Sequence, residues 1–223
     1  MNEVAKDFQS RTLHRIVQLA PQIEMPAHIQ RRIARGEKFD VAFLIPSMLD
    51  ELSKAGHILP ASRTCFMKVP IGIAVKAGSA RPDISTVDAF KHTVLNARSI
   101  AYLKTGISGP HLQCLFETFG IAGEIEAKSF RPETDNVGEL VAMGHAEIGI
   151  TAISTLMATN GIDVVGPIPK ELQTYVEFEG AMSATASNPD VAGMLLDFIV
   201  INSVAEVVRS KGMEPWSVDR GER

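Results

Sequence analysis

Residues 69–78 read VPIGIAVKAG, an almost continuous apolar run with a proline near its start. Such a run is typical of a strand covered on both faces of a sheet, and we interpret it as a strand that leaves one lobe and enters another. Further along, residues 106–111 read GISGPH and lead into the amphipathic stretch HLQCLFETFGI at 111–121. A glycine-rich turn before a helix presents free backbone N–H groups that attract anions. The two stretches together predict a two-lobed protein that closes on a small acidic ligand.

The chain has 223 residues, of which 45% are hydrophobic and 22% charged, an ordinary composition for a globular protein. Its net charge of −4 gives no electrostatic reason to expect nucleic acid or an anionic membrane as a partner. No apolar run reaches the roughly 18 residues that cross a bilayer, so direct membrane insertion is not expected. Residues 1–15, MNEVAKDFQSRTLHR, are polar where a signal peptide has its apolar region. We therefore expect no export signal in the chain as written, which leaves a cytoplasmic location open.

Strand patterns alternate with helix patterns along the chain. The expected strands lie at residues 14–20, 39–45, 69–75, 99–102, 128–130, 147–150 and 164–165, with a second crossing strand within 175–186. The expected helices lie at residues 26–36, 47–55, 84–95, 111–119, 136–144, 154–159, 191–200 and 204–210. This alternation predicts an α/β architecture with mainly parallel sheets.

Five stretches resemble, in their order, the type II periplasmic-binding-protein fold. They are VPIGIAVKAGSARPDIST at 69–86, SIAYLKTGISGPHL at 99–112, GHAEIGITAIS at 144–154, DVVGPIPKELQ at 163–173 and KGMEPW at 211–216. The likeness is to the molybdate-binding-protein-like substrate-binding branch of ABC transporters. It implies two α/β lobes, 1–70 plus 178–223 and 71–177, joined by two crossing strands with the ligand in the cleft between them. It also implies ABC transporter membrane subunits as partners and a periplasmic location.

The N-terminal region departs from this family. Members begin with an apolar strand, a turn of small residues and a full helix, whereas here residues 4–17, VAKDFQSRTLHRIV, resemble the end of that helix running into the second strand. We therefore expect the first strand of lobe 1 and its ligand-contacting turn to be missing from the chain as written. A sheet without an internal strand exposes unpaired backbone groups, which is costly when they are buried.

Ligands of parallel sheets bind beyond the carboxyl ends of the strands, where helices present their N-termini. Three such places are recognisable: the loop after 99–102, the turn after EIGI at 147–150, and the turn after FLI at 43–45. Their small and hydroxyl residues can cap a helix, donate to an anion or admit close backbone approach. The predicted ligand-binding residues are Ser47, Thr105, Ser108, Gly109, Thr151 and Ser154. We expect the loop from Thr105 to His111 to line the cleft.

The sequence contains no P-loop, no GxGxxG, no HxH and no HExxH, and its six histidines form no cluster. We therefore predict neither a metal site nor a cofactor. His111 differs from the other histidines because it lies in the first turn of the helix after the glycine loop.

Two functions remain open. The first is a solute-binding protein that captures a small oxyanion or carboxylate. The second is an enzyme, because some members of the wider family resemble isomerases that shift a proton on tricarboxylates such as aconitate. In that case Tyr102, Lys104 and His111 are the candidate acid–base groups.

Overall fold

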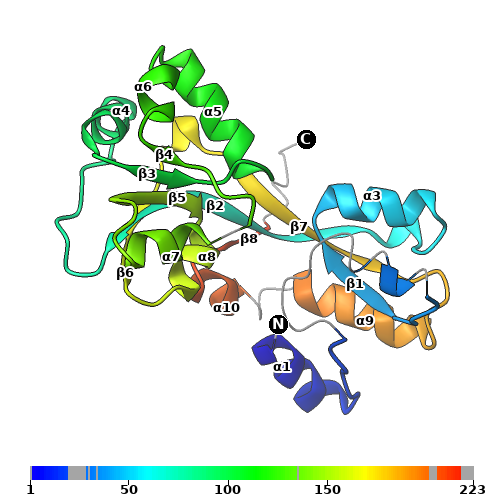
Figure 1. The fold of residues 1–223 in the computed structure, drawn as a ribbon. Helices are drawn as coiled ribbons and strands as arrows, with labels where there is room; N and C mark the ends of the chain where they lie inside the picture. Colours follow the sequence, from blue (N-terminus) through cyan, green and yellow to red (C-terminus); the bar gives the residue numbers. More distant parts are fainter. Residues whose placement is uncertain are drawn as a thin grey trace, which may run out of the picture. The chain divides into compact units, whose positions relative to one another are not determined.

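The computed structural model describes residues 2–19, 29, 31–33, 35–134, 136–200 and 205–216. Two strands, β2 (Thr64–Lys76) and β7 (Tyr175–Met182), each contribute residues to two structural units (Figure 1). Unit 1 comprises Met1–Lys68, Glu177–Ser210 and Glu214–Arg223, and unit 2 comprises Val69–Val176 and Lys211–Met213. The predicted two-lobed α/β class with two crossing strands is confirmed.

Unit 2 is built on a five-stranded sheet in the order β6-β2-β5-β3-β4. Its further strands are β3 (Ile100–Tyr102), β4 (Ser129–Phe130), β5 (Ile148–Ala152) and β6 (Ile162–Pro167). Strand β3 runs parallel to both β4 and β5, whereas β2 runs antiparallel to β5 and β6. Parallel neighbours require helical crossovers, and β2 instead enters this sheet directly from unit 1. The expectation of mainly parallel sheets is therefore wrong in detail.

Helices cover both faces of this sheet (Figure 1). They are α4 (Val87–Asn96), α5 (Ser108–Thr118), α6 (Ala122–Glu126), α7 (Val137–Ala142) and α8 (Ile153–Ala158), with a 3₁₀ turn η2 (Lys170–Leu172). The side chains of β3 alternate between the faces: Ile100 and Tyr102 pack with α4, α5 and α6, while Ala101 packs with α7. Burial on both faces explains why these strands are apolar throughout.

Unit 1 pairs β1 (Val41–Leu44) with β7 and the first part of β2 with β8 (Glu214–Pro215), both antiparallel. Its helices are α1 (Asn2–Thr12), α3 (Pro46–Lys54), η1 (Pro60–Ser62), α9 (Pro189–Val200) and α10 (Ala205–Ser210). Phe8 of α1 packs edge-to-face on Phe198 of α9, with ring centroids 5.3 Å apart. None of the helices in the described part of the chain is long and apolar enough to cross a membrane.

The predicted strand at 14–20 is not formed in its described part. Residues 13–18 belong to no helix or strand, and Ala20 lies outside the described residues. The backbone N–H of Ile16 donates to Gln9 Oε1 at 2.7 Å rather than to a strand, and Val17 is 67% exposed. An apolar period of two is not enough to form a strand when no neighbouring strand pairs with it. Of the predicted helix at 26–36, the described residues Ile29 and 31–33 are helical.

Candidate anion-binding site

Three loops gather at the carboxyl edge of the parallel strands β4, β3 and β5 in unit 2. We call them the edge loops: residues 103–107 before α5, residues 131–136 before α7, and residues 152–154 at the start of α8. The first two touch each other, because Lys104 N–H donates to Pro132 O at 2.9 Å. Asp135 lies outside the described residues. Sequence analysis predicts the first and third of these loops, and the structure adds the second.

The first edge loop is held against the helix that follows it. A Cβ on Gly109 would lie 2.2 Å from Leu103 O, so only glycine allows α5 to rest on the end of β3. Gly106 has a φ of +77°, Thr105 is exposed, and Ser108 is only 3% exposed. The N-cap of α5 is Ile107, which makes Ser108 the first helical residue and not the cap that its sequence suggests. The N-terminal N–H groups of this 11-residue helix therefore face the edge.

Arg131 is the residue at this edge that sequence reasoning missed. Its Nη2 donates to Gln113 Oε1 of α5 at 2.8 Å, and its Cζ lies 5.1 Å from the ring centroid of Tyr102. Its Nε is buried and has no hydrogen-bond partner among the described residues. No ion pair joins Arg131 to a described carboxylate. The available signal was its position directly after the predicted strand at 128–130, at the same edge as the predicted loops.

Asn136 presents a second unsatisfied polar group. It is the N-cap of α7, as its spacing to Glu139 suggests, but its side chain makes no capping bond. Its Oδ1 is buried without a partner among the described residues. A buried amide without a partner costs free energy, and the amide can present either its oxygen or its NH₂ to the same place. The loop that carries Arg131 and Asn136 thus offers hydrogen-bonding capacity that the described residues leave unused.

The third edge loop carries the predicted residues Thr151 and Ser154. Thr151 is fully buried inside β5, opposite Gly72 of β2 in the strand register. Ser154 is the second residue of α8 and is half-buried. Among the predicted residues, Ser154 therefore lies at the edge itself, and Thr151 lies one step inside the sheet.

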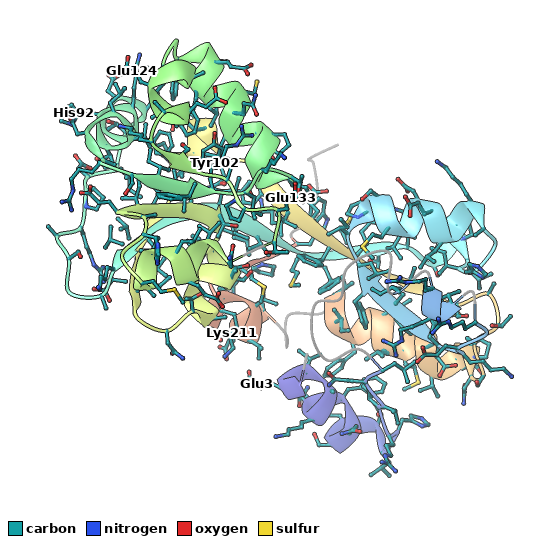
Figure 2. The ribbon with its side chains drawn as sticks, in the orientation of Figure 1. Glu3, His92, Tyr102, Glu124, Glu133 and Lys211 are labelled. Carbon is teal, nitrogen blue, oxygen red and sulfur yellow. The ribbon has the colours of Figure 1, made fainter. Side chains whose placement is uncertain are left out.

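The three acid–base candidates have other contacts. Tyr102 is buried against Phe116, with ring centroids 5.6 Å apart, and burial raises the pKa of its phenol (Figure 2). His111 lies 2.7 Å from Leu172 O; because a carbonyl only accepts, Nε2 is the donor in this bond. Lys104 pairs with Glu133 at 3.2 Å on the exposed surface. Each of the three candidates therefore already has a contact within unit 2.

Ser47 belongs to unit 1 and is exposed. Helix α3 begins at Pro46 with Ile45 as its N-cap, so Ser47 is the second helical residue and the interpretation as an N-cap is wrong. Proline at the first helical position explains this shift, because its fixed φ suits that place. The role of Ser47 as a ligand contact stays a prediction. Among the described residues, no three His, Cys, Asp or Glu side chains form a group that could hold a metal ion.

Comparisons with known proteins agree with this architecture. Residues 1–214 match the sequence profile described as bacterial extracellular solute-binding protein. A relative named aconitate isomerase, from a Pseudomonas species, is 34% identical in an alignment of 218 residues that covers 96% of this chain and 83% of the relative.

Two solved structures show the same fold. The substrate-binding domain of a protein assigned to molybdenum ABC transport in Clostridium difficile superposes with a TM-score of 0.78 at 13% identity, covering 97% of this chain and 93% of that one. The periplasmic molybdate-binding protein of Azotobacter vinelandii gives a TM-score of 0.66 at 16% identity, covering 95% and 92%. The resemblance to periplasmic binding proteins is confirmed. The chain belongs to the family of bacterial extracellular solute-binding proteins.

Proposed function

We propose that this protein captures a small anion, an oxyanion or a carboxylate, at the edge loops of unit 2. The observation that carries the proposal is Arg131, whose guanidinium has no carboxylate partner among the described residues and whose buried Nε has no acceptor. An arginine so placed offers a charge-assisted hydrogen bond, which is shorter and stronger than a neutral one. An anion at this edge would balance the charge of Arg131 and accept a hydrogen bond from its Nε–H.

Local charges matter here because the whole chain repels anions weakly, with a net charge of −4. The positive end of α5 adds a fixed partial charge to that of Arg131. Lys104, by contrast, is already paired with Glu133 at the surface. The attraction for an anion is therefore concentrated where Ser108, Arg131 and Asn136 approach the edge.

The names of the similar proteins support the binding of an anion. One solved neighbour is assigned to molybdenum transport and another is a molybdate-binding protein of the periplasm, while the relative at 34% identity is named aconitate isomerase. We infer that the protein works outside the cytoplasmic membrane and delivers its ligand to ABC transporter membrane subunits. The predicted residues Thr105, Ser108, Gly109 and Ser154 lie on the edge loops or the helices that begin there.

A panel of anions tests the proposal. Isothermal titration calorimetry with molybdate, sulfate, cis-aconitate and trans-aconitate should give saturable one-to-one binding for one chemical class. The same ligands should raise the melting temperature, because a ligand at about 100 times its dissociation constant stabilises by roughly 2.7 kcal/mol. Neither heat nor stabilisation from any of the four would overturn the proposal.

Isomerisation of aconitate is the second candidate, and the relative named aconitate isomerase favours it. The reaction needs one positioned base. It removes a proton from the methylene carbon, the electron pair delocalises across the double bond, and a proton returns to the opposite carbon. No oxidant, reductant or metal enters this balance. Tyr102, Lys104 and His111 stay the candidate bases, and each already contacts another residue in the described arrangement.

Turnover in D₂O separates the two functions. An isomerase interconverts cis- and trans-aconitate and places deuterium on the methylene carbon, and both changes are visible by proton NMR. A capture protein binds either isomer and leaves the spectrum of the free ligand unchanged. Turnover that disappears in His111→Gln but persists in Lys104→Gln would assign the base to His111 and overturn the preference for pure binding.

A further inference from the structure

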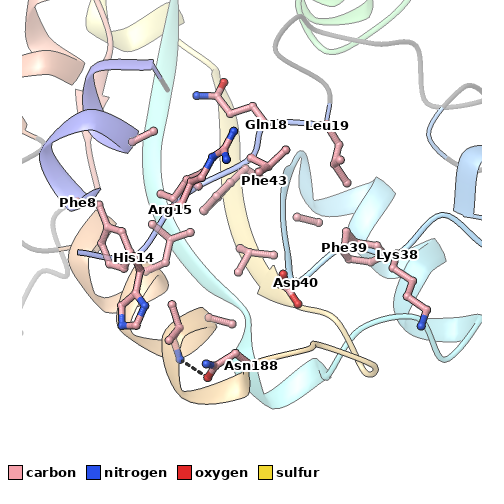
Figure 3. A pocket seen from close by; sticks show the side chains of 18 of the residues that line it. Phe8, His14, Arg15, Gln18, Leu19, Lys38, Phe39, Asp40, Phe43 and Asn188 are labelled. Atoms are coloured by element: carbon pink, nitrogen blue, oxygen red, sulfur yellow. Dashed lines mark hydrogen bonds between the residues drawn. The ribbon is translucent and has the colours of Figure 1, made fainter. Parts of the chain in front are cut away.

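Two cavities are lined by residues outside the edge loops. One, of about 470 Å³, lies in unit 1 beside strand β1 (Figure 3). The other, of about 1200 Å³, lies in unit 2 and is lined mainly by residues 75–83, helix α4 and residues 144–148. The buried side-chain N and O atoms of the described chain that have no hydrogen-bond partner are Arg131 Nε and Asn136 Oδ1, and neither residue lines these cavities. The unused hydrogen-bonding capacity of the described chain therefore lies at the edge loops.

Helix α5 holds the guanidinium of Arg131 through Gln113. Arg131 Nη2 donates to Gln113 Oε1 at 2.8 Å, and Gln113 Nε2 donates to Glu117 Oε1 at 3.1 Å. Gln113 and Glu117 are four residues apart on the helix, a spacing that brings two side chains together on one face. The ring of Tyr102 gives the guanidinium a second support, 5.1 Å from Cζ to the ring centroid. The guanidinium is thus held at one nitrogen and on one face, while its Nε makes no bond to a described residue.

Glu117 decides which way the amide of Gln113 points. The oxygen and the nitrogen of an amide have nearly the same shape, so the hydrogen-bond partners determine the orientation. A carboxylate only accepts, which requires the NH₂ group to face Glu117, and a guanidinium only donates, which requires the oxygen to face Arg131. The reverse orientation would bring two acceptors together on one side and two donors together on the other. Both contacts therefore select the same orientation of the amide.

The neutral acceptor leaves the charge of Arg131 uncompensated. Arg63 in unit 1 shows the contrast, because its Nε donates to Glu179 Oε2 at 2.7 Å and its Nη1 to Asp50 Oδ1 at 2.5 Å. Two carboxylates thus take up the charge of Arg63. Arg131 is held by an amide instead, and no ion pair joins it to a described carboxylate. A guanidinium that is held in place but not neutralised can still make a charge-assisted hydrogen bond.

Three described carboxylates lie around this cluster, and none of them neutralises Arg131. Glu133 is paired with Lys104 at 3.2 Å. Glu117 contacts the cluster through its bond to α5, and Glu126 acts on the neighbouring phenol of β3. Both of these side chains are exposed, so water and salt screen their charges. The contact that would remove the charge of Arg131, a carboxylate bonded to the guanidinium, is absent among the described residues.

We propose that Gln113 and Glu117 are positioning residues for the anion site. Glu117 orients the amide of Gln113, and the amide oxygen holds Arg131 so that its charge and its Nε–H remain available to the anion. This inference rests on the proposed function, and neither Gln113 nor Glu117 is assigned a contact with the anion. A carboxylate at position 113 should therefore abolish the site without disturbing the fold, because Gln113 is exposed and the introduced group would pair with Arg131.

Calorimetry near pH 7 with molybdate, sulfate, cis-aconitate and trans-aconitate tests the proposal on the parent protein and on Gln113→Glu. The anion that the parent binds should bind roughly tenfold more weakly or worse in Gln113→Glu, the range for losing a hydrogen bond to a charged group. The melting temperature of the variant should stay the same or rise, because the introduced carboxylate gains Arg131 as a partner. A purely structural role of Gln113 would instead lower affinity and melting temperature together.

Thr118→Glu is the matched control, since it adds the same charge to the last residue of α5. Its affinity should stay within about twofold of the parent, as for most surface substitutions. Glu117→Gln should lower affinity less than Gln113→Glu does, because the amide of Gln113 then has no acceptor-only partner. In ¹⁵N NMR spectra, Glu117→Gln should also shift the side-chain NH₂ signals of Gln113 in the anion-free protein.

The outcomes separate this inference from the proposed function. Anion binding by the parent that Gln113→Glu retains, or that Thr118→Glu weakens equally, would overturn the positioning role and leave the proposed function standing. Side-chain NH₂ signals of Gln113 that stay unmoved in Glu117→Gln would remove Glu117 from the proposal. A parent protein that binds none of the four anions would overturn the proposed function, and this inference with it.

Discussion

Arg131 illustrates how much a single residue can say about function. It follows a two-residue strand, stacks near Tyr102 and donates to Gln113, yet its Nε and its charge are left without partners among the described residues. Buried polar groups in proteins nearly always have a partner, so an exception calls for an explanation. The anion that we propose would satisfy this group and also fits the neighbouring helix N-terminus.

Replacement of Arg131 by Gln should weaken anion binding by about 1.5–3 kcal/mol, roughly tenfold to a hundredfold in dissociation constant, the range for a hydrogen bond to a charged group. Calorimetry with the tightest anion of the panel measures it. Lys104→Gln is the matched control: it removes a positive charge at the same edge, but one already paired with Glu133. Equal losses of anion affinity in both variants would mean that only net charge matters, and Arg131 would then no longer be assigned to the binding site.

Ser108 tests the contribution of helix α5 to the anion site. Ser108→Ala should weaken anion binding by about 1–3 kcal/mol, because a charged acceptor loses one hydrogen bond. Since Ser108 is the first residue of α5 and not its cap, the helix should keep its stability. Unchanged affinity with an unchanged melting temperature would leave Ser108 as a packing residue.

At the scale of elements, the contact between α5 and the end of β3 decides where the helix N-terminus lies. Gly109 allows that contact, because its missing Cβ would otherwise overlap Leu103 O. The start of β5 is fixed by a different device. Glu147 accepts the backbone N–H of Arg98 at 2.8 Å, and its own N–H donates to Ser99 Oγ at 3.0 Å, which ties β5 to the start of β3.

Gly109→Ala should displace α5 from β3 and lower the free energy of unfolding by about 1–3 kcal/mol, the usual cost of overpacking. Anion affinity should fall with it, because the N–H groups of α5 move. Gly123→Ala in α6 is the control, since its Cβ would meet nothing within 4 Å and alanine favours helix. Chemical denaturation and calorimetry on both variants make the comparison. A Gly109→Ala protein as stable as Gly123→Ala would contradict the close approach.

Glu147 gives a pH-dependent prediction. The backbone N–H of Arg98, then its guanidinium, hold the pKa of this carboxyl below its ordinary value of 4.5. Because the pKa is lower in the folded chain, its contribution to stability is present above about pH 4.5 and is lost as the pH falls through the lowered value. Its side chain is 40% exposed, so solvent screening keeps the contribution below about 1 kcal/mol.

Glu147→Gln should therefore destabilise the protein slightly at pH 7, and the difference from the parent protein should vanish toward pH 3. Denaturation midpoints measured across that range give the answer, with Glu124→Gln on the exposed face of α6 as the control. A difference that stays constant or grows on acidification would be the wrong sign.

At the scale of the whole molecule, sequence patterns predicted the fold class, the crossing strand and most elements, because apolar periodicity reports burial directly. Strand 69–75 appears within β2, and the helix led by Thr86 appears as α4 with Thr86 accepting the N–H of Ala89 at 3.1 Å. The strand direction in unit 2 was not predictable, because periodicity carries no information on which strands become neighbours. Arg131 was missed for a related reason. An arginine after a strand indicates a binding site only when the structure shows that its buried Nε has no hydrogen-bond partner.

One measurement tests the central claim most directly: an NMR titration of the ¹⁵N-labelled protein with molybdate and with cis-aconitate, following the backbone amides and the Arg131 Nε–H. The account predicts saturable shifts concentrated at Ser108, Arg131, Asn136 and Ser154 for the anion that binds, and their loss in Arg131→Gln. Shifts that saturate elsewhere in the chain, with the resonances of these four residues unmoved, would contradict it.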